Sequence, residues 1–171
     1  MTVVYLGFGS NMGDKEDVIN QAIKRIQKFC EVTKLSSLYV TEPVGYKNQE
    51  WFLNCVVEVK TKLDPIKLLT VCTEVEQQLG RKTSVKNGPR IIDIDILFYG
   101  DKVTKRDDLV IPHPRLHERL FVLQPMMDVN PGFVHPVLKK TIKELYDQVR
   151  IKNVEKVEWY KEMVFNCSSY S

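Results

Sequence analysis

The sequence has few cysteines and no long hydrophobic run. Its four cysteines, among 171 residues, are scattered with no CxxC pair, and no Cys/His spacing typical of a zinc site is present. The N-terminus lacks the basic-then-apolar layout of a secretory signal, and no apolar run approaches the ~20 residues that a membrane helix needs. These absences predict a reduced, cytoplasmic protein with no membrane partner.

A strong excess of charge and the common nucleotide-binding motifs are also missing. The 25 Lys+Arg against 22 Asp+Glu leave a net charge of +3, which is too small to indicate a nucleic-acid partner. No GxxxxGK[ST] segment occurs, and the glycines at residues 7–9 lack the GxGxxG spacing. The P-loop and dinucleotide-binding folds are therefore excluded, and no nucleic acid is expected as a partner.

The hydrophobic patterning is that of a single α+β domain over residues 1–171. At this length a chain buries roughly 70% of the surface that it exposes when unfolded, so one core suffices. Strand patterns cover 2–9, 31–40, 52–61 and 91–99, and helical patterns cover 14–29, 65–79, 116–127 and 140–149. This order predicts a ferredoxin-like βαββαβ core with a mostly antiparallel sheet. Residues 151–171 form an extension of unassigned role that could add a strand or pack on the surface.

Two aspartates interrupt the most strand-like run of the chain, which spans residues 91–99. Alternation along a strand places Asp93 and Asp95 on one face and the neighbouring isoleucines on the other. Two such carboxylates repel each other unless a positive charge lies near them, and Mg²⁺ is commonly held by one or two carboxylates plus substrate phosphates. The alternative is a solvated edge strand, but aspartate is depleted in strands. The pattern therefore favours a metal site.

A basic stretch lies directly before this strand. Residues 81–90 contain four cations and no acid, and they include Arg81 and Arg90. Cations beside a metal-binding carboxylate pair are the groups needed to hold and transfer a polyphosphate. A solvated basic loop is the alternative. Further along the chain, His113 and Arg119 are candidates for phosphate contacts.

Aromatic residues supply a weaker signal. Phe52 and Phe121 could sandwich a flat heterocycle while Asn54 reads its edge, but most phenylalanines belong to the core. From the pattern alone, the core interpretation is favoured for these residues.

Several segments together resemble the hydroxymethyldihydropterin pyrophosphokinase family of folate biosynthesis, in chain order from residue 2 to about 150. They are Gly9-Ser10-Asn11, Thr41-Glu42-Pro43-Val44-Gly45, Phe52-Leu53-Asn54, Glu76 ahead of Gly80-Arg81, Gly88-Pro89-Arg90 followed by Asp93 and Asp95, and Pro112-His113-Pro114-Arg115-Leu116 through Arg119 and Phe121.

The resemblance implies transfer of a diphosphate from ATP to 6-hydroxymethyl-7,8-dihydropterin, with release of AMP, by a monomer that uses two Mg²⁺ ions. It implies that Asp93 and Asp95 bind the metals and that Arg81, Arg90 and Asp95 are catalytic. The residues implied in ATP binding are Glu76, Arg81, Arg90, Ile96, Leu109, Val110, His113 and Arg119. The residues implied in pterin binding are Thr41, Val44, Gly45, Phe52, Asn54 and Phe121.

Two alternatives remain open at this point. One is a ferredoxin-like module that binds nucleic acid or protein without catalysis, for which salt-dependent binding and no need for Mg²⁺ are expected. The other is a different nucleotide-dependent phosphotransferase that acts on another heterocycle.

Overall fold

The computed structural model describes residues 1–43, 48–81, 89–152 and 155–164. In these ranges no helix is long and apolar enough to cross a membrane. The elements are β1 (Thr2–Ser10), α1 (Lys15–Ile26), β2 (Glu31–Leu35), β3 (Leu38–Thr41), β4 (Phe52–Thr61), α2 (Pro65–Gln78), β5 (Asp93–Tyr99), β6 (Thr104–Lys105), β7 (Val110–Ile111), the short 3₁₀ helix η1 (Leu116–Glu118), α3 (Leu120–Val129), α4 (Ile142–Lys152) and β8 (Val157–Lys161).

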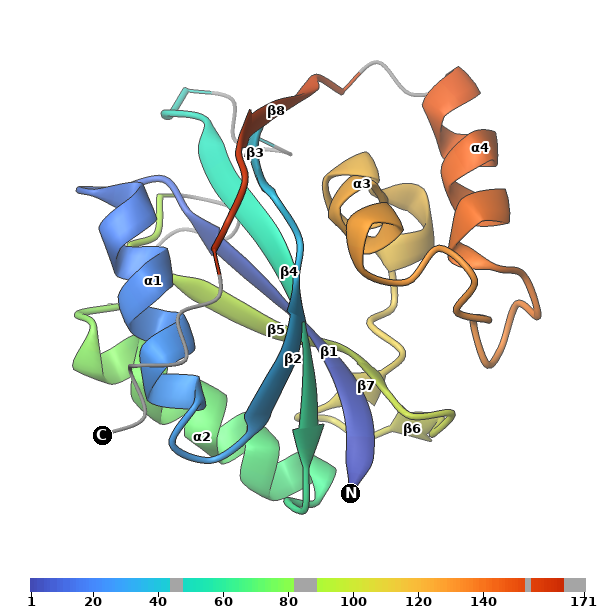
Figure 1. Ribbon diagram of the computed structural model, residues 1–171, viewed down its shortest axis with the longest axis horizontal. Coiled ribbons are helices and arrows are strands. Elements are labelled where there is room, and N and C mark those ends of the chain that lie inside the picture. Colours follow the sequence, from blue (N-terminus) through green and yellow to red (C-terminus); the bar gives the residue numbers. More distant parts are fainter. Residues whose placement is uncertain (44–47, 82–88, 153–154, 165–171) are drawn as a thin grey trace.

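The main sheet has the strand order β5-β1-β4-β3-β8, and β2 also pairs with β4. All of these pairs are antiparallel. Helices α1 and α2 lie on one side of the sheet, and α3 and α4 lie on the other (Figure 1). The arrangement β1-α1-β2/β3-β4-α2-β5 confirms the expected ferredoxin-like α+β fold.

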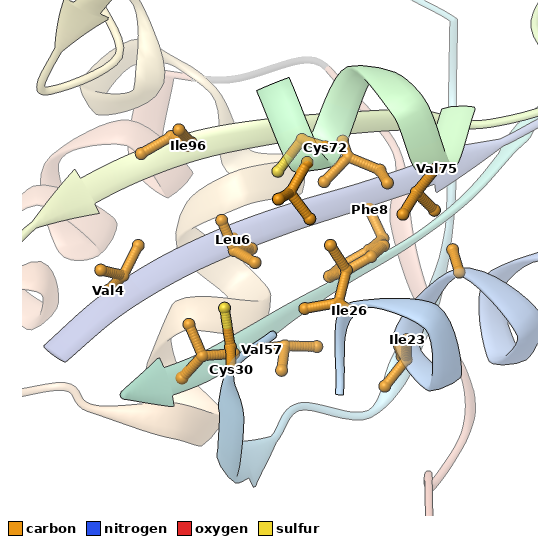
Figure 2. Close-up of a cluster of buried hydrophobic side chains, with 14 of the residues drawn as sticks. Val4, Leu6, Phe8, Ile23, Ile26, Cys30, Val57, Cys72, Val75 and Ile96 are labelled. Carbon is orange, nitrogen blue, oxygen red and sulfur yellow. The ribbon is translucent and has the colours of Figure 1, made fainter. Parts of the chain in front are cut away.

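Each face of the sheet carries its own hydrophobic core, because successive strand residues point to opposite faces. Alternate residues Val4, Leu6 and Phe8 of β1 pack against α1 and α2, as Figure 2 shows. On the opposite face, Tyr5 of β1 and Leu97 of β5 pack in the cluster that includes α3 and α4. The sheet is therefore a central layer whose two faces are both covered.

The sequence also specifies where the two helices of the first layer begin. The Asp14 side chain accepts a hydrogen bond from the amide of Asp17, and that of Asp64 accepts one from the amide of Lys67, ahead of Pro65 at the first turn of α2. Such caps satisfy backbone amides that have no partner within a helix.

The strand expected over residues 31–40 is interrupted. It forms β2 and β3, which pair with different parts of β4. Between them, the buried Ser36 donates its amide to the Val56 carbonyl at 2.9 Å and accepts the Val56 amide on its hydroxyl at 2.8 Å. A side-chain oxygen therefore replaces a backbone acceptor, and the pairing is broken at this residue.

The C-terminal half differs from the expectation mainly at element boundaries. The helix expected over 116–127 starts as the 3₁₀ turn η1 and continues as α3 from Leu120, with Pro125 inside the helix. The strand expected over 91–99 begins at Asp93. In the C-terminal extension, β8 adds a strand beside β3, which was one of the two expected possibilities.

Candidate active site

A pocket opens on the α3 side of the sheet, over the middle of β1, β4 and β5. The residues that line it come from these three strands, from the end of β3 and the residue after it, from the end of the basic stretch, and from the start of α3 with the residue before it. They are Gly7, Phe8, Gly9, Thr41, Glu42, Phe52, Asn54, Cys55, Val56, Arg90, Asp93, Asp95, Leu97, Arg119, Phe121 and Val122.

The two aspartates point into this pocket, as the strand alternation predicts. In the ladder between β1 and β5, Asp95 lies opposite Gly7 and Asp93 lies opposite Gly9. Ile94 lies on the other face, in the core against α1 and α2. The carboxylates thus sit beside two positions that have no side chain, so the floor of the pocket is open at the acidic pair.

Asp95 has an unusual electrostatic environment. Desolvation by burial, followed by the negative charges of Asp93 and Glu76, raises the pKa of Asp95 to about 8. Its carboxylate forms no hydrogen bond or ion pair with the residues that the structure describes. A carboxylate in this state is stabilised in its ionised form when a cation binds beside it.

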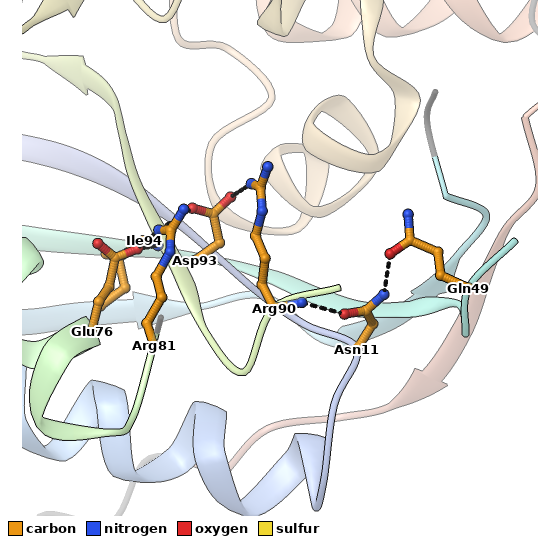
Figure 3. Close-up of polar contacts among 7 residues, drawn as sticks. All are labelled: Asn11, Gln49, Glu76, Arg81, Arg90, Asp93 and Ile94. Carbon is orange, nitrogen blue, oxygen red and sulfur yellow. Dashed lines mark hydrogen bonds and ion pairs between the residues drawn. The ribbon is translucent and has the colours of Figure 1, made fainter. Parts of the chain in front are cut away.

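Asp93 is, by contrast, held between two arginines, as Figure 3 shows. Its Oδ1 accepts from Arg81 Nη1 at 2.9 Å, and its Oδ2 accepts from Arg90 Nη1 at 3.0 Å. Arg81 Nη1 also donates to the buried Glu76 carboxylate, which accepts the Ile94 amide at 3.0 Å. Burial raises the pKa of Glu76, and the Ile94 amide and Arg81 oppose this shift. The chain Glu76–Arg81–Asp93–Arg90 therefore connects α2 to the pocket.

Asn11, just after β1, joins this network to a distant segment (Figure 3). Its Oδ1 accepts the Arg90 amide at 2.8 Å, and its own amide donates to the Arg90 carbonyl at 3.1 Å. Its Nδ2 donates to Gln49 Oε1 at 2.8 Å and to the Glu50 carbonyl at 3.0 Å. The buried Asn11 side chain thus holds the end of the basic stretch against the segment that precedes β4.

His113 and Arg119 supply basic groups whose pKa values are lowered by burial and by neighbouring cations, and only partly restored by nearby acids. Burial, and then the charge of Arg119, lowers the pKa of His113, while burial and Arg115 lower the pKa of Arg119. In the described part of the chain, His113 Nδ1 and Arg90 Nε are buried and have no hydrogen-bond partner. Donors of this kind are suited to an anionic ligand.

The expected pterin-binding residues are brought together only in part by the described structure. Phe52, Asn54 and Phe121 line the pocket with Thr41. Asn54 Nδ2 donates to the Thr41 hydroxyl, and the Arg119 guanidinium lies 5.6 Å from the centre of the Phe121 ring. Val44 and Gly45 lie outside the described residues.

Other expected site residues lie away from this pocket. Ile96 and Leu109 are buried in the core cluster that also contains Cys72 and Val75 of α2, and Val110 is in β7. These residues, like Glu76 and Arg81, lie outside the pocket lining itself. Ile96 and Leu109 therefore lie on the α2 side of the sheet, opposite the face that carries the acidic pair.

Sequence reasoning missed Gly7, Gly9 and Glu42, which line the pocket, and the linking role of Asn11. The signal for the glycines was present, because their spacing of two residues on a strand repeats that of Asp93 and Asp95. Within the described ranges, no group of three or more His, Cys, Asp or Glu side chains forms a metal site.

A sequence model of the 7,8-dihydro-6-hydroxymethylpterin-pyrophosphokinase family matches residues 5–131. The chain belongs to this pyrophosphokinase family. The match includes both aspartates, the basic stretch and every pocket residue named above. It confirms the resemblance on which the transferase and folate-biosynthesis expectations depend.

Similar proteins extend the pyrophosphokinase comparison over most of the chain. The 2-amino-4-hydroxy-6-hydroxymethyldihydropteridine pyrophosphokinase of Aquifex aeolicus is 42% identical over 152 residues, which cover 89% of this chain and 95% of that protein. The folic acid synthesis protein FOL1 of Dictyostelium discoideum is 44% identical over 84% of this chain, but the match spans only 22% of its length. A solved structure of Plasmodium falciparum HPPK-DHPS with pteroate has a TM-score of 0.72 at 20% identity, with 86% of this chain and 42% of that chain covered. This structural likeness supports the fold.

Proposed function

We propose that the protein catalyses Mg²⁺-dependent transfer of a diphosphate from ATP to 6-hydroxymethyl-7,8-dihydropterin, which yields the pterin diphosphate and AMP. The observation that carries the proposal is the pair Asp93 and Asp95, which faces Gly7 and Gly9 in a pocket bordered by arginines and aromatic rings. A pocket that combines charged side chains with aromatic rings is suited to a phosphorylated nucleotide and a heterocycle.

The acidic pair fits magnesium. Carboxylate oxygens are hard ligands, and Asp95 has no described partner while neighbouring acids and burial raise its pKa. We propose that Asp93 and Asp95 hold two Mg²⁺ ions together with phosphate oxygens of ATP. When bound, the metal ions would offset phosphate charge and lower the pKa of the acceptor hydroxyl.

The chain's own cations would hold and orient the polyphosphate. We assign Arg81, Arg90, His113 and Arg119 to phosphate contacts. Arg90 Nε and His113 Nδ1 are buried without a described partner, and burial and Arg115 lower the pKa of Arg119, which an anion would reverse. The fixed Arg90 backbone, bonded twice to Asn11, keeps its guanidinium at the pocket. Charge stabilisation of this kind, applied as the bridging oxygen leaves, accounts for catalysis by Arg81 and Arg90. The remaining residues assigned to ATP are Glu76, Ile96, Leu109 and Val110.

The aromatic residues of the same pocket would bind the pterin. Phe52 and Phe121 offer ring faces for stacking. Because Asn54 Nδ2 donates to Thr41, its Oδ1 is the atom left to accept from the N–H groups of the heterocycle. We assign Val44 and Gly45 to the same subsite from the family resemblance alone.

We further propose that the chain acts as a single pyrophosphokinase domain and as a monomer in the cytoplasm, without a nucleic-acid partner. The three cysteines of the described ranges, Cys30, Cys55 and Cys72, are free thiols buried in the core, which is typical of a reducing compartment.

The direct test is an assay for AMP formation from ATP and Mg²⁺, with and without the reduced pterin. We expect AMP only when all three are present. Asp95→Asn keeps the size of the side chain and removes its charge, and it should lower the rate by about 10²-fold or more. Asp101→Asn, at an exposed position after β5, is the matched control and should retain full activity.

Two outcomes would contradict the proposal. AMP formation that is independent of the pterin would indicate a different acceptor. Full activity in Asp95→Asn would refute the metal assignment, and salt-steep binding to nucleic acid with no AMP formation would favour a binding module instead.

A further inference from the structure

Strand β8 lies outside the region that matches the family model, which ends at residue 131. It runs antiparallel to β3 along the outer edge of the sheet, although the two strands are far apart in the sequence (Figure 1). Its partner residues on β3 are Leu38 through Thr41. The C-terminal extension therefore contacts the strand that ends at the pocket.

Strand β3 is anchored by the buried Leu38 and by Tyr39, whose hydroxyl donates to Asp128 at 2.7 Å, but along its outer side β8 is its partner among the described strands. Strand β3 is four residues long and pairs with β4 through only three residues, of which the last is Thr41 opposite Phe52. Thr41 and Glu42 both line the pocket. With β8 absent, β3 would be an edge strand with one row of unpaired backbone groups, and Glu42 would lose the partner of its amide.

Specific bonds join β8 to the pocket rim at one end and to α1 at the other. The Glu42 amide donates to the Lys156 carbonyl at 3.0 Å, and the Lys156 amide donates to the Glu42 carboxylate at 3.3 Å. At the far end, Lys161 Nζ lies 2.7 Å from Glu16 Oε1. Both ends of the strand are thus fixed, so β8 can hold β3 in place.

The segment that leads into β8 also acts on the opposite wall of the pocket. The negative charge of Glu155 raises the pKa of Arg119, against the effects of burial and of Arg115. Glu155 is therefore close enough to Arg119 for an electrostatic contact. Glu155 thus acts on Arg119, and Lys156 bonds Glu42, and both of these partners line the pocket.

We propose that β8 is a positioning element for the pterin subsite, which acts by holding Thr41 and Glu42 in the conformation that receives the heterocycle. This inference rests on the proposed function. Because apparent affinity falls in proportion to the fraction of competent molecules, release of β3 in nine molecules of ten would raise the KM for the pterin about tenfold. The KM for ATP should change little, because the ATP contacts proposed for α2 and β5 do not involve β3 and because release of β3 leaves Glu155 and Arg119 in the chain.

A proline substitution tests this role in the full-length chain. Hydrogen-bonded pairs alternate in an antiparallel ladder, so the Glu42–Lys156 bond makes Val40–Glu158 the next bonded pair. Glu158→Pro therefore removes an amide that faces β3. Glu162→Pro is the matched control, because it makes the same chemical change just beyond the end of β8.

We expect Glu158→Pro to raise the KM for the pterin about tenfold relative to Glu162→Pro, with the KM for ATP changed less than twofold. Hydrogen exchange in the peptide 38–43 should become faster in Glu158→Pro and remain unchanged in the control. Lys156→Pro, which removes only the amide that donates to Glu42, provides the test if Glu158→Pro does not fold, and it should raise the KM for the pterin about threefold.

The possible outcomes distinguish failure of the proposed role of β8 from failure of the proposed function. An unchanged KM for the pterin together with faster exchange refutes the role of β8 and leaves the proposed function intact. An equal rise in both KM values refutes it as well, since that pattern indicates a general loss of structure. A wild-type chain that forms no AMP with the pterin refutes the proposed function itself, and the role of β8 with it.

Discussion

Substitution of Gly9 by alanine should impair pterin binding while leaving the rest of the fold nearly unchanged. A Cβ at this residue would lie 2.5 Å from Asn54 Oδ1, a distance that real Cβ atoms essentially never show. Gly9 and Asn54 are opposite each other in the β1–β4 ladder, so neither backbone can withdraw. In Gly9→Ala the Asn54 side chain must therefore rotate away and lose its bond to Thr41.

The expected effect on stability is small, and the expected effect on binding is large. One neutral hydrogen bond lost at a partly buried site lowers the free energy of unfolding by about 1 kcal/mol. A rotated Asn54 also loses its contacts with the heterocycle, which at about 1 to 1.5 kcal/mol for each of two hydrogen bonds amounts to about 2 to 3 kcal/mol. The KM for the pterin should thus rise about 30- to 150-fold, while the KM for ATP stays the same.

Gly7→Ala is the matched control on the same face of the same strand. A Cβ at Gly7 would lie 3.5 Å from the Leu97 side chain, which is an ordinary van der Waals contact. Steady-state kinetics with each substrate varied in turn, together with urea unfolding, measures both effects. A pterin KM in Gly9→Ala within threefold of that in Gly7→Ala would refute the reasoning that Asn54 reads the pterin.

Two further predictions concern residues outside the lining of the pocket. Asn11→Ala removes the acceptor of the Arg90 amide and the Nδ2 donor that bonds Gln49 and Glu50. The free energy of unfolding should therefore fall by about 2 to 3 kcal/mol, and AMP formation should slow. A urea midpoint equal to that of the wild type would contradict this. His135 is buried, and its Nδ1 accepts hydrogen bonds from the Val137 and Leu138 amides. Burial lowers the pKa of His135, so its imidazole binds a proton more readily in the unfolded chain than in the folded one. The free energy of unfolding should therefore fall as the pH drops below about 6.5. The side-chain oxygen of His135→Asn can accept the same amides, so in this variant we expect a smaller loss of stability between pH 7 and 5. If thermal unfolding shows the same dependence of the melting temperature on pH as in the wild type, His135 is not the titrating group.

Much of the fold follows from local patterns. Period-two alternation places Asp93 and Asp95 on one face of β5, and the cap at Asp64 with Pro65 marks the start of α2. These features depend on neighbouring residues only, since strand and helix geometry fixes which side chains share a face. The interruption at Ser36 was missed, because it depends on hydrogen bonds with Val56, twenty residues away in the sequence.

The site shows the same division. The residue types, their order and their spacing, by resemblance to the pyrophosphokinase family, determined the expected chemistry and most of its residues. Only the tertiary structure decided that Gly9 lies against Asn54, that Asn11 joins Arg90 to the segment before β4, and that β8 pairs with β3. The physical reason is that these contacts join segments far apart in the chain, whose approach is set by the packing of both faces of the sheet and leaves no periodic signal in the sequence.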